Sequence, residues 1–334
     1  MKIRLSTLIA WGCLCVACSP SPSTVPLVYV SSFPKDTTIN LEKVPMIPAQ
    51  INPRCMLFSD GKLLVRTSTP TDAIYSVFSY PEMKHLSYFG ERLEYIVPLE
   101  ESRDEFYLVR SDSLCSYKWV EGDSLKQSSS SYFYNVMGQR ILGLAKLESN
   151  LYAYPNSYFD AGGTDEFFII NLSQKQKKPL GIYPDSPVNY QSVSDFKSAY
   201  AHYIHAKPDG SRLLVSYIRT RRNRIYDRNG NMLHDILLNF EPCQTVVDKN
   251  MKKRFSHLKD VFVTDNAIYL LCPDAKDDNS FCSLIVADWD GKFKERYHIN
   301  QKINYFIVDE STNRFCGINS NDPHNFYLFS LKNN

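Results

Sequence analysis

The sequence predicts an all-β fold, a six-bladed β-propeller with four-stranded blades. Three observations lead to this class. Short apolar or alternating runs are separated by turn residues along the whole chain, with very little helical periodicity. A unit of strand, polar turn and second strand recurs about every 45 to 60 residues, a period that suits a propeller blade. Tyr (22) and Phe (19) outnumber Gly (13), and these aromatic residues favour sheets.

The first hairpin of each unit is marked by its turn. Asp60-Gly61 and Asp209-Gly210 lie between apolar runs, and such pairs are strong hairpin signals. Asn229-Gly230 and Asp290-Gly291 mark further hairpins in the same way. The sequence thus predicts six units, whose first turns centre near residues 60, 104, 149, 209, 265 and 312.

Further strands follow each hairpin. Third strands are expected at residues 74–80, 112–120, 166–172, 222–228, 283–289 and 325–331. Fourth strands are expected at residues 85–90, 177–183, 232–238 and 292–299. The last unit stops after its third strand, so we expect residues 27–41 to supply the missing strand and close the ring, which removes the open edges. A pair of β-sandwiches is the alternative, but it does not explain a repeat through the whole chain.

The N-terminus has the pattern of a lipoprotein leader. Lys2 and Arg4 precede an uncharged apolar stretch at residues 5–17, which is too short to span a membrane and has signal-peptide proportions. Its end, Cys15-Val16-Ala17-Cys18, resembles a bacterial lipobox, with Cys15 where Leu is usual. The alternative, a metal or redox cluster with Cys13, is a poor one because zinc requires four positioned ligands. We therefore predict that Cys18 is the acylated residue.

This leader sets the domain boundaries and the location. Residues 1–17 are predicted as the signal peptide, 18–26 as the lipidated cysteine with a Ser/Pro tether, and 27–334 as one propeller domain. The acyl chains would anchor the protein to the outer membrane without a transmembrane helix. No acidic stretch follows Cys18 to direct it to the cell surface, so we expect the periplasmic side.

The first unit carries a specific set of residues, namely Asp72, Tyr75, Val77, Phe78 and Phe89-Gly90. By these residues, and by a layout that matches over nearly all the mature chain, the sequence resembles the bacterial TolB-like six-bladed propeller lipoproteins. The sequence departs from the family at residues 91–95, where members have a Gly-Pro-Gly-Glu segment. The resemblance implies a propeller fold and an envelope location, and it brings no catalytic residues.

Six cysteines follow Cys18, and one pair has a sequence argument for a disulfide. Residues 268–272 and 281–288 are expected to form a hairpin, in which Cys272 and Cys282 would face each other. An exported protein meets oxidising conditions, so a bond is possible there, and two buried free thiols are the alternative.

Three polar groups are candidates for sites. His202 and His205 lie three apart, so on one strand they would point to opposite faces and not share a metal ion, although either would line the central channel from an innermost strand. The arginine-rich run at residues 219–224 would grip phosphate or carboxylate groups, or else form a solvated hairpin tip. The acidic loop at 274–279 lacks calcium-site spacing and is interpreted as a polar hairpin loop.

No local motif predicts an enzyme, a metal site or a cofactor. A net charge of +2 gives no reason to expect a nucleic-acid partner. The predicted function is a monomeric, lipid-anchored binding or scaffold module for an envelope protein or glycan, with contacts expected in the Tyr-rich segments 128–135, 152–163 and 183–196. The alternative is an enzyme, lactonase- or lyase-like, with a polar or metal site in the central channel.

Overall fold

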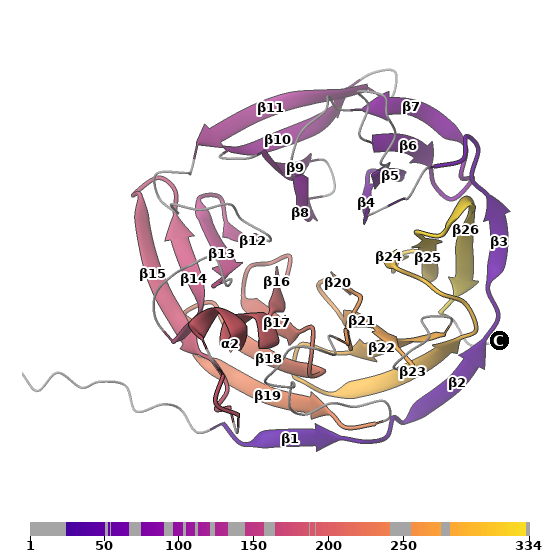
Figure 1. Cartoon of the computed structure of the whole chain (residues 1–334). Coiled ribbons are helices and arrows are strands. Elements are labelled where there is room, and N and C mark those ends of the chain that lie inside the picture. The colour runs from indigo at the N-terminus through magenta and orange to yellow at the C-terminus, as the bar shows by residue number, and fades with distance from the viewer. Residues whose placement is uncertain are drawn as a thin grey trace, which may run out of the picture.

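Six sheets stand side by side around a common axis, as Figure 1 shows for a computed structural model of the protein. The structure describes residues 25–50, 53, 55–66, 75–89, 96–102, 105–110, 113–120, 124–132, 144–156, 164–186, 188–190, 192–240, 255–274 and 281–331. The predicted leader, Cys18 and most of the tether lie outside these residues. We number the sheets 1 to 6 by the chain order of their innermost strands.

Sheets 1 to 3 each contain four consecutive strands. Sheet 1 consists of β4 (Cys55–Ser59), β5 (Lys62–Arg66), β6 (Tyr75–Ser79) and β7 (His85–Phe89). Sheet 2 consists of β8 (Ile96–Ser102), β9 (Glu105–Arg110), β10 (Ser113–Val120) and β11 (Ser124–Tyr132). Sheet 3 consists of β12 (Ala145–Glu148), β13 (Leu151–Pro155), β14 (Asp165–Asn171) and β15 (Gln176–Ile182).

Sheets 4 to 6 each add one strand from the N-terminal segment. Sheet 4 consists of β16 (His202–Ala206), β17 (Arg212–Tyr217), β18 (Arg222–Asp227), β19 (Met232–Leu238) and β1 (Leu27–Val30). Sheet 5 consists of β20 (Asp260–Val263), β21 (Ile268–Pro273), β22 (Cys282–Ala287), β23 (Phe293–Ile299) and β2 (Lys35–Ile39). Sheet 6 consists of β24 (Tyr305–Asp309), β25 (Arg314–Asn319), β26 (Asp322–Ser330) and β3 (Glu42–Pro45).

The three N-terminal strands form a belt around the outside of sheets 4 to 6 (Figure 1). β1 pairs in parallel with β19 and β2 with β23, whereas β3 pairs antiparallel with β26. The ring is therefore closed by residues 42–45, and the prediction that residues 27–41 supply this strand is wrong. Residues 27–41 have the stronger strand pattern, but they add fifth strands to two other sheets, and the weakly patterned Glu42–Pro45 reaches sheet 6.

Buried apolar residues lie between neighbouring sheets. One core cluster joins sheets 3 and 4 through residues such as Phe167 and Val215, and another joins sheets 4 and 5 through Leu214 and Leu270. Comparable clusters join sheets 5 and 6, sheets 6 and 1, and sheets 1 and 2. Sheets 1, 4, 5 and 6 thus bury both faces against their neighbours, which is the packing of a β-propeller, and the predicted all-β propeller fold is confirmed.

The strand positions also follow the sequence pattern. The expected third strands correspond to β6, β10, β14, β18, β22 and β26, and the expected fourth strands to β7, β15, β19 and β23. At the first predicted turn, Asp60 and Gly61 have φ values of 50° and 66°, as a tight type I′ hairpin requires. β11 was not predicted, because its serine-rich sequence SLKQSSSSY lacks the apolar alternation of a half-buried strand.

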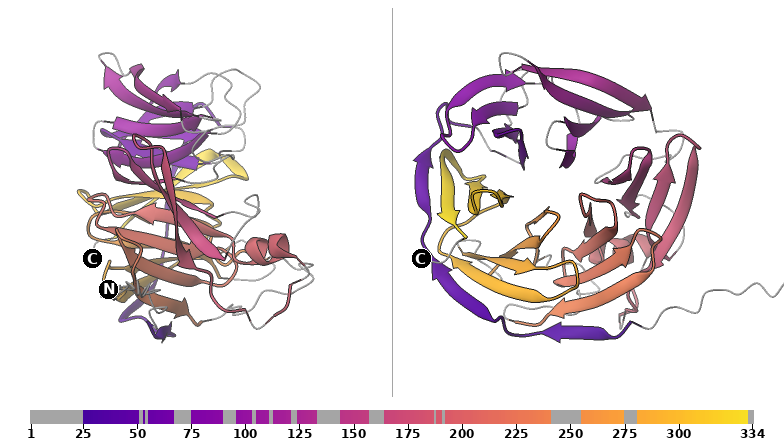
Figure 2. Two further views of the ribbon diagram at one scale, coloured as in Figure 1. Left: turned by 90° about the vertical axis from the view of Figure 1, so that its left-hand side faces the viewer. Right: turned by 180° about the vertical axis from the view of Figure 1, so that it is seen from behind.

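Helix α2 (Val193–Ala199) is the one helix in the part of the chain that the structure describes, and it lies in the connection from β15 to β16. Its N-cap is Ser192, whose hydroxyl accepts a hydrogen bond from the Asp195 amide at 3.0 Å. Figure 2 shows α2 standing off one face of the disc. The expected Tyr-rich loop at 183–196 is therefore partly helical, and its Tyr183 is buried rather than offered as a contact surface.

The two faces of the disc carry different connections. From the inner strand outward, the first four strands of a sheet run alternately in opposite directions. The connection that leads into an inner strand therefore lies on the same face of the disc as the loop between the second and third strands. We call this the loop face, and it carries α2, the connections at 218–221 and 300–304 and the start of β22. The opposite face, the turn face, carries hairpin turns such as 60–61 and 149–150.

Candidate functional site

Four side chains near the propeller axis form the first candidate site, which we call the axial cluster. Tyr203 and His205 come from β16, Asp260 from β20 and Tyr305 from β24, which are the innermost strands of sheets 4, 5 and 6. Figure 1 shows these strands as the ones that lie nearest the centre of the ring. All four side chains keep some accessible surface, and Tyr203 is 36% exposed. The axial cluster therefore joins three sheets and remains open to solvent.

Hydrogen bonds hold two members of the axial cluster. The Asp260 carboxylate accepts a hydrogen bond from the Phe306 amide at 3.1 Å, which links β20 to β24. The Tyr203 hydroxyl donates to the Lys259 carbonyl at 3.3 Å, which links β16 to the segment before β20. These bonds orient an acid and a phenol from different sheets toward one region of the axis.

Electrostatics distinguish Asp260 from an ordinary surface acid. Burial raises the pKa of Asp260 to about 7, against the opposing effects of the Phe306 and Val261 amides and of His205. Burial likewise raises the pKa of Tyr203, with further contributions from Asp260 and Tyr305. A carboxyl group that exchanges its proton near neutral pH is typical of binding and catalytic sites.

Three cations lie beside the axial cluster on the loop face, and we call them the rim cations: Arg219, Lys259 and Lys302. Burial lowers the pKa of Lys259, and the positive charges of Lys302 and Arg219 lower it further. The Arg219 guanidinium donates to the Phe255 carbonyl at 3.2 Å and to the Ser256 hydroxyl at 3.3 Å, which holds the charged end of the side chain beside the segment that leads into β20. Lys302 and Arg219 are thus close enough to Lys259 for their positive charges to disfavour its protonated form.

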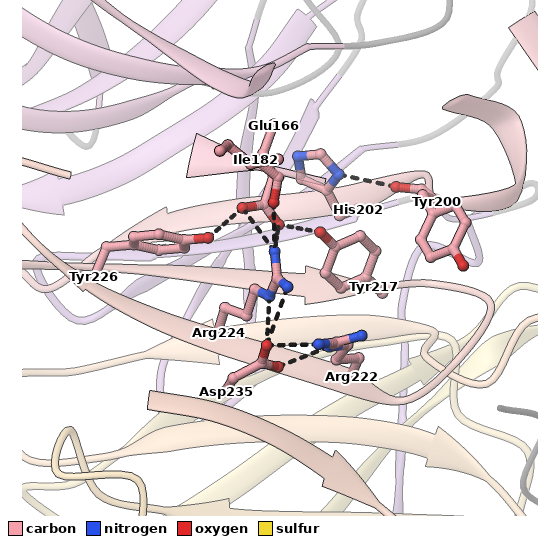
Figure 3. Close-up of polar contacts among 9 residues, drawn as sticks. All are labelled: Glu166, Ile182, Tyr200, His202, Tyr217, Arg222, Arg224, Tyr226 and Asp235. Atoms are coloured by element: carbon pink, nitrogen blue, oxygen red, sulfur yellow. Dashed lines mark hydrogen bonds and ion pairs between the residues drawn. The ribbon is translucent and has the colours of Figure 1, made fainter. Parts of the chain in front are cut away.

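A buried carboxylate network is the second candidate site (Figure 3). Glu166 on β14 is fully buried and accepts hydrogen bonds from the hydroxyls of Tyr217 and Tyr226. The Arg224 guanidinium lies 3.4 Å from both Glu166 oxygens and donates to the Ile182 carbonyl at 2.8 Å. The network therefore joins sheet 3 to sheet 4.

The network continues to a second carboxylate, and its charges balance. Asp235 on β19 contacts Arg224 at 3.0 Å and Arg222 at 2.6 Å. Burial alone would raise the pKa of Asp235, but the hydrogen bond from Arg222 and the charge of Arg224 hold it below its ordinary value. Glu166, Arg224 and Asp235 are buried and the Arg222 side chain is 20% exposed, so we assign the network to holding sheets 3 and 4 in register.

The two predicted histidines separate as expected from their spacing. His202 is buried on the side of β16 that faces sheet 3, and its Nδ1 lies 3.0 Å from the Tyr200 carbonyl. Burial lowers the pKa of His202, which favours its neutral form. His205 lies on the opposite side and belongs to the axial cluster.

The interpretation of residues 219–224 as a solvated hairpin tip is wrong. Arg221 is 2% exposed and donates to the carbonyls of Phe240 at 3.0 Å and Pro273 at 2.5 Å. Arg222 and Arg224 bind Asp235. Three of the four arginines thus turn inward, and Arg219 alone of the four lies among the rim cations. The carbonyls and acids that bind these arginines lie outside the run, so the run alone did not indicate which way its side chains point.

The prediction that Cys272 and Cys282 face each other is also wrong. In the β21–β22 register Cys272 lies opposite Ser283, and Cys282 lies opposite Pro273. A shift of one residue places the two thiols on opposite faces of sheet 5, and both are free and buried. The free-thiol alternative therefore describes this hairpin.

The acidic loop after β21 is described only at its start. Asp274 contacts Arg296 at 3.2 Å and accepts a hydrogen bond from Ser283 at 2.7 Å, so it has a structural role in sheet 5. The rest of the loop, residues 275–280, lies outside the described residues. Within the described ranges, no three His, Cys, Asp or Glu side chains converge in a way that would hold a metal ion. No described helix has the length and apolar character to cross a bilayer.

Sequence reasoning missed Asp260 and Glu166. Asp260 carries one local signal, since it is an acid at the first position of an expected inner strand after a long connection. Glu166 carries none, because its partners Tyr217, Arg224 and Tyr226 lie 51 to 60 residues further along the chain. Their meeting depends on the packing of two sheets.

Comparisons with known proteins support the fold. No family model and no curated protein matches the chain. A solved structure of a DUF4221 family member from Bacteroides vulgatus is similar, with a TM-score of 0.58 and 12% identity over 86% of this chain and 97% of that one. The β-propeller domain of Myceliophteria thermophila Cps50 (Swd1) gives a TM-score of 0.46 at 10% identity, covering 86% of this chain and 98% of that one. The structure of Chaetomium thermophilum Raptor gives a TM-score of 0.49 at 12% identity, covering 88% of this chain and 29% of that one. The chain is thus a β-propeller protein, similar in fold to the DUF4221 structure.

Proposed function

We propose that this protein is a binding module of the bacterial cell envelope, whose loop face docks an envelope protein or glycan. In this proposal each of the six sheets is one blade of a six-bladed propeller of the TolB-like type. Acylated Cys18 anchors the protein to the periplasmic side of the outer membrane, and the Ser/Pro tether separates the disc from the bilayer. The protein acts as a monomer without a cofactor.

One observation carries the choice of face: exposed large apolar side chains gather on the loop face. Ile47, Ile182, Val193 and Phe281 are each at least half exposed and lie in connections or strand ends on this face. Among the described residues, Val120, which is 43% exposed, is the one exposed large apolar side chain at the turn face, and Val28, Tyr29 and Tyr88 lie on the outer strands β1 and β7. Exposed apolar groups rimmed by polar residues are typical of protein interaction surfaces.

A crosslinked pull-down from native membranes, read by mass spectrometry, tests this proposal. We expect the full-length protein to capture a reproducible partner, and the double variant Ile182→Asp/Val193→Asp to reduce the capture about tenfold or more, because buried apolar contacts dominate such interfaces. Val120→Asp at the turn face is the matched control and should leave capture unchanged. Capture that survives the double variant but is lost in Val120→Asp contradicts the choice of face. Cys18→Ala tests the anchor separately and should release the protein from membranes.

The alternative, an enzyme with a polar site at the axis, is favoured by the proximity of Asp260 and His205. Such a lactonase- or lyase-like enzyme would need a proton donor and acceptor at the axis, and this pair supplies both. Hydrolysis of simple lactones by the wild type that is lost in Asp260→Asn would support catalysis. Equal rates in the two proteins would exclude Asp260 as a catalytic group.

A further inference from the structure

The rim cations come from three separate segments of the loop face. Arg219 lies between β17 and β18, Lys259 precedes β20, and Lys302 lies between β23 and β24. All three side chains are half-buried. Among the described residues, no ion pair joins Lys259 or Lys302 to a carboxylate. Three sheets thus bring positive charge together where partial burial weakens its screening by water.

This arrangement costs free energy that an anion would recover. The neighbouring charges of Lys302 and Arg219, together with burial, disfavour the protonated form of Lys259. An anion between the rim cations replaces repulsion by attraction, and charge-assisted hydrogen bonds add to it. Protein surfaces that concentrate one sign of charge in this way attract small ligands of the opposite sign.

The axial cluster supplies hydrogen-bond donors beside the rim cations. The Tyr203 hydroxyl bonds to the Lys259 carbonyl, and the charge of Arg219 acts on the pKa of Tyr203, so the phenol lies beside the Lys259 backbone and close to one rim cation. Asp260 and Tyr305 influence Tyr203 electrostatically, so they lie close to it. A protonated carboxyl and a phenol both donate hydrogen bonds, and a phenol ring also offers an apolar face to a sugar.

We propose that the rim cations and the axial cluster bind a small organic anion, a carboxylate- or phosphate-bearing sugar, at the axis on the loop face. This site is separate from the apolar docking surface around Ile182 and Val193, and it does not depend on a partner. Arg219, Lys259 and Lys302 hold the anionic group, while Tyr203 and Asp260 contact the hydroxyls or the anion itself.

Calorimetric titration of the full-length protein in detergent tests the ligand class. Glucuronate, glucose 6-phosphate and inorganic phosphate are the probes, and glucose is the neutral control. We expect at least one anionic probe to bind at least about tenfold more tightly than glucose, and the ranking of glucuronate against the phosphates identifies a carboxylate or phosphate ligand. No binding of any anion at about 10 mM, or equal binding of glucose, overturns the proposal.

Charge variants locate the site. Lys259→Gln/Lys302→Gln should weaken binding of the anion about tenfold or more, because both positive charges are removed from its surroundings. Lys292→Gln removes one exposed lysine at the turn face of sheet 5 and is the matched control, with no change expected. Unchanged binding in the double variant contradicts the proposal. Ile182→Asp/Val193→Asp should bind the anion normally, so loss of partner capture and loss of the anion site are distinguishable.

The pH profile tests the role of Asp260. The groups that face Asp260 are His205 and Tyr203 from β16, Cys55 from β4 and the backbone amide of Phe306. Ionised Asp260 repels an anion, whereas the protonated form donates a hydrogen bond, so affinity should rise as the pH falls from 8 to 6. Asp260→Asn should flatten this profile and tighten binding at pH 8, with His205→Gln separating any contribution of the histidine. An unchanged profile in Asp260→Asn contradicts the placement of the anion at the axial cluster.

Discussion

Replacing Glu166 with Gln is expected to lower the free energy of unfolding by about 3–5 kcal/mol. Glu166 is fully buried, accepts hydrogen bonds from two tyrosine hydroxyls and faces Arg224. The amide keeps the shape of the side chain but removes its charge, so the buried network is left with one acid for two arginines. Breaking a buried ion pair by removing one partner is costly because an uncompensated charge remains inside the protein.

Glu148→Gln is the matched control for this measurement. Glu148 also pairs with an arginine, Arg228, but both side chains are about half exposed. An exposed pair contributes roughly 0–1 kcal/mol, so the control should change stability little. Chemical denaturation at constant protein concentration measures both variants. Equal effects of Glu166→Gln and Glu148→Gln would show that the network does not hold sheets 3 and 4 together.

Replacing Asp260 with Asn is expected to stabilise the protein at pH 8 by about 2 kcal/mol. Burial raises the pKa of this carboxyl from 3.8 to about 7, so the folded protein resists its ionisation. The unfolded chain releases the proton as the pH rises above about 4, and the destabilisation is complete above about 7. The full shift corresponds to at most about 4 kcal/mol, and the partial exposure of Asp260 reduces the effect.

The stabilisation by Asp260→Asn should depend on pH. The gain from Asp260→Asn should be clearly smaller at pH 5, where folded wild-type protein keeps the proton. Asp309 on the neighbouring inner strand is the control, because hydrogen bonds from Ser311 and Thr312 outweigh burial and lower its pKa. Asp309→Asn should therefore destabilise the protein at pH 8. Destabilisation by Asp260→Asn at pH 8 would contradict the assignment of Asp260 as a costly buried acid retained for binding.

Much of the strand layout was predictable from the sequence because its turns are local. Pairs such as Asp60-Gly61 and Asn229-Gly230 favour positive φ, so hairpin positions follow from two adjacent residues. The belt was harder to predict from the sequence. Residues 42–45, and not 27–41, pair with sheet 6 because the chain first runs past two other sheets. Helix α2 had one local signal, the N-cap Ser192 before Asp195.

The sites were less predictable than the fold. A one-residue shift in the β21–β22 register reverses the facing of Cys272 and Cys282, and no sequence pattern specifies that register. The inward direction of Arg221 and Arg224 depends on carbonyls and acids from other segments. The opposite facing of His202 and His205 was predictable because the rule for strands is purely local, but the sequence did not say which of the two reaches the axis. Asp260 could be identified as a candidate site residue only from the structure, which shows the neighbouring inner strands beside it.

Photo-crosslinking in living cells tests the central claim, that the loop face docks a partner, most directly. A photoreactive amino acid would replace Val193 at the loop face in one strain and Val120 at the turn face in another, since both side chains are exposed. The account predicts a crosslinked adduct of defined mass from position 193 and none from position 120. An adduct from position 120 alone, or none from either position, would contradict it.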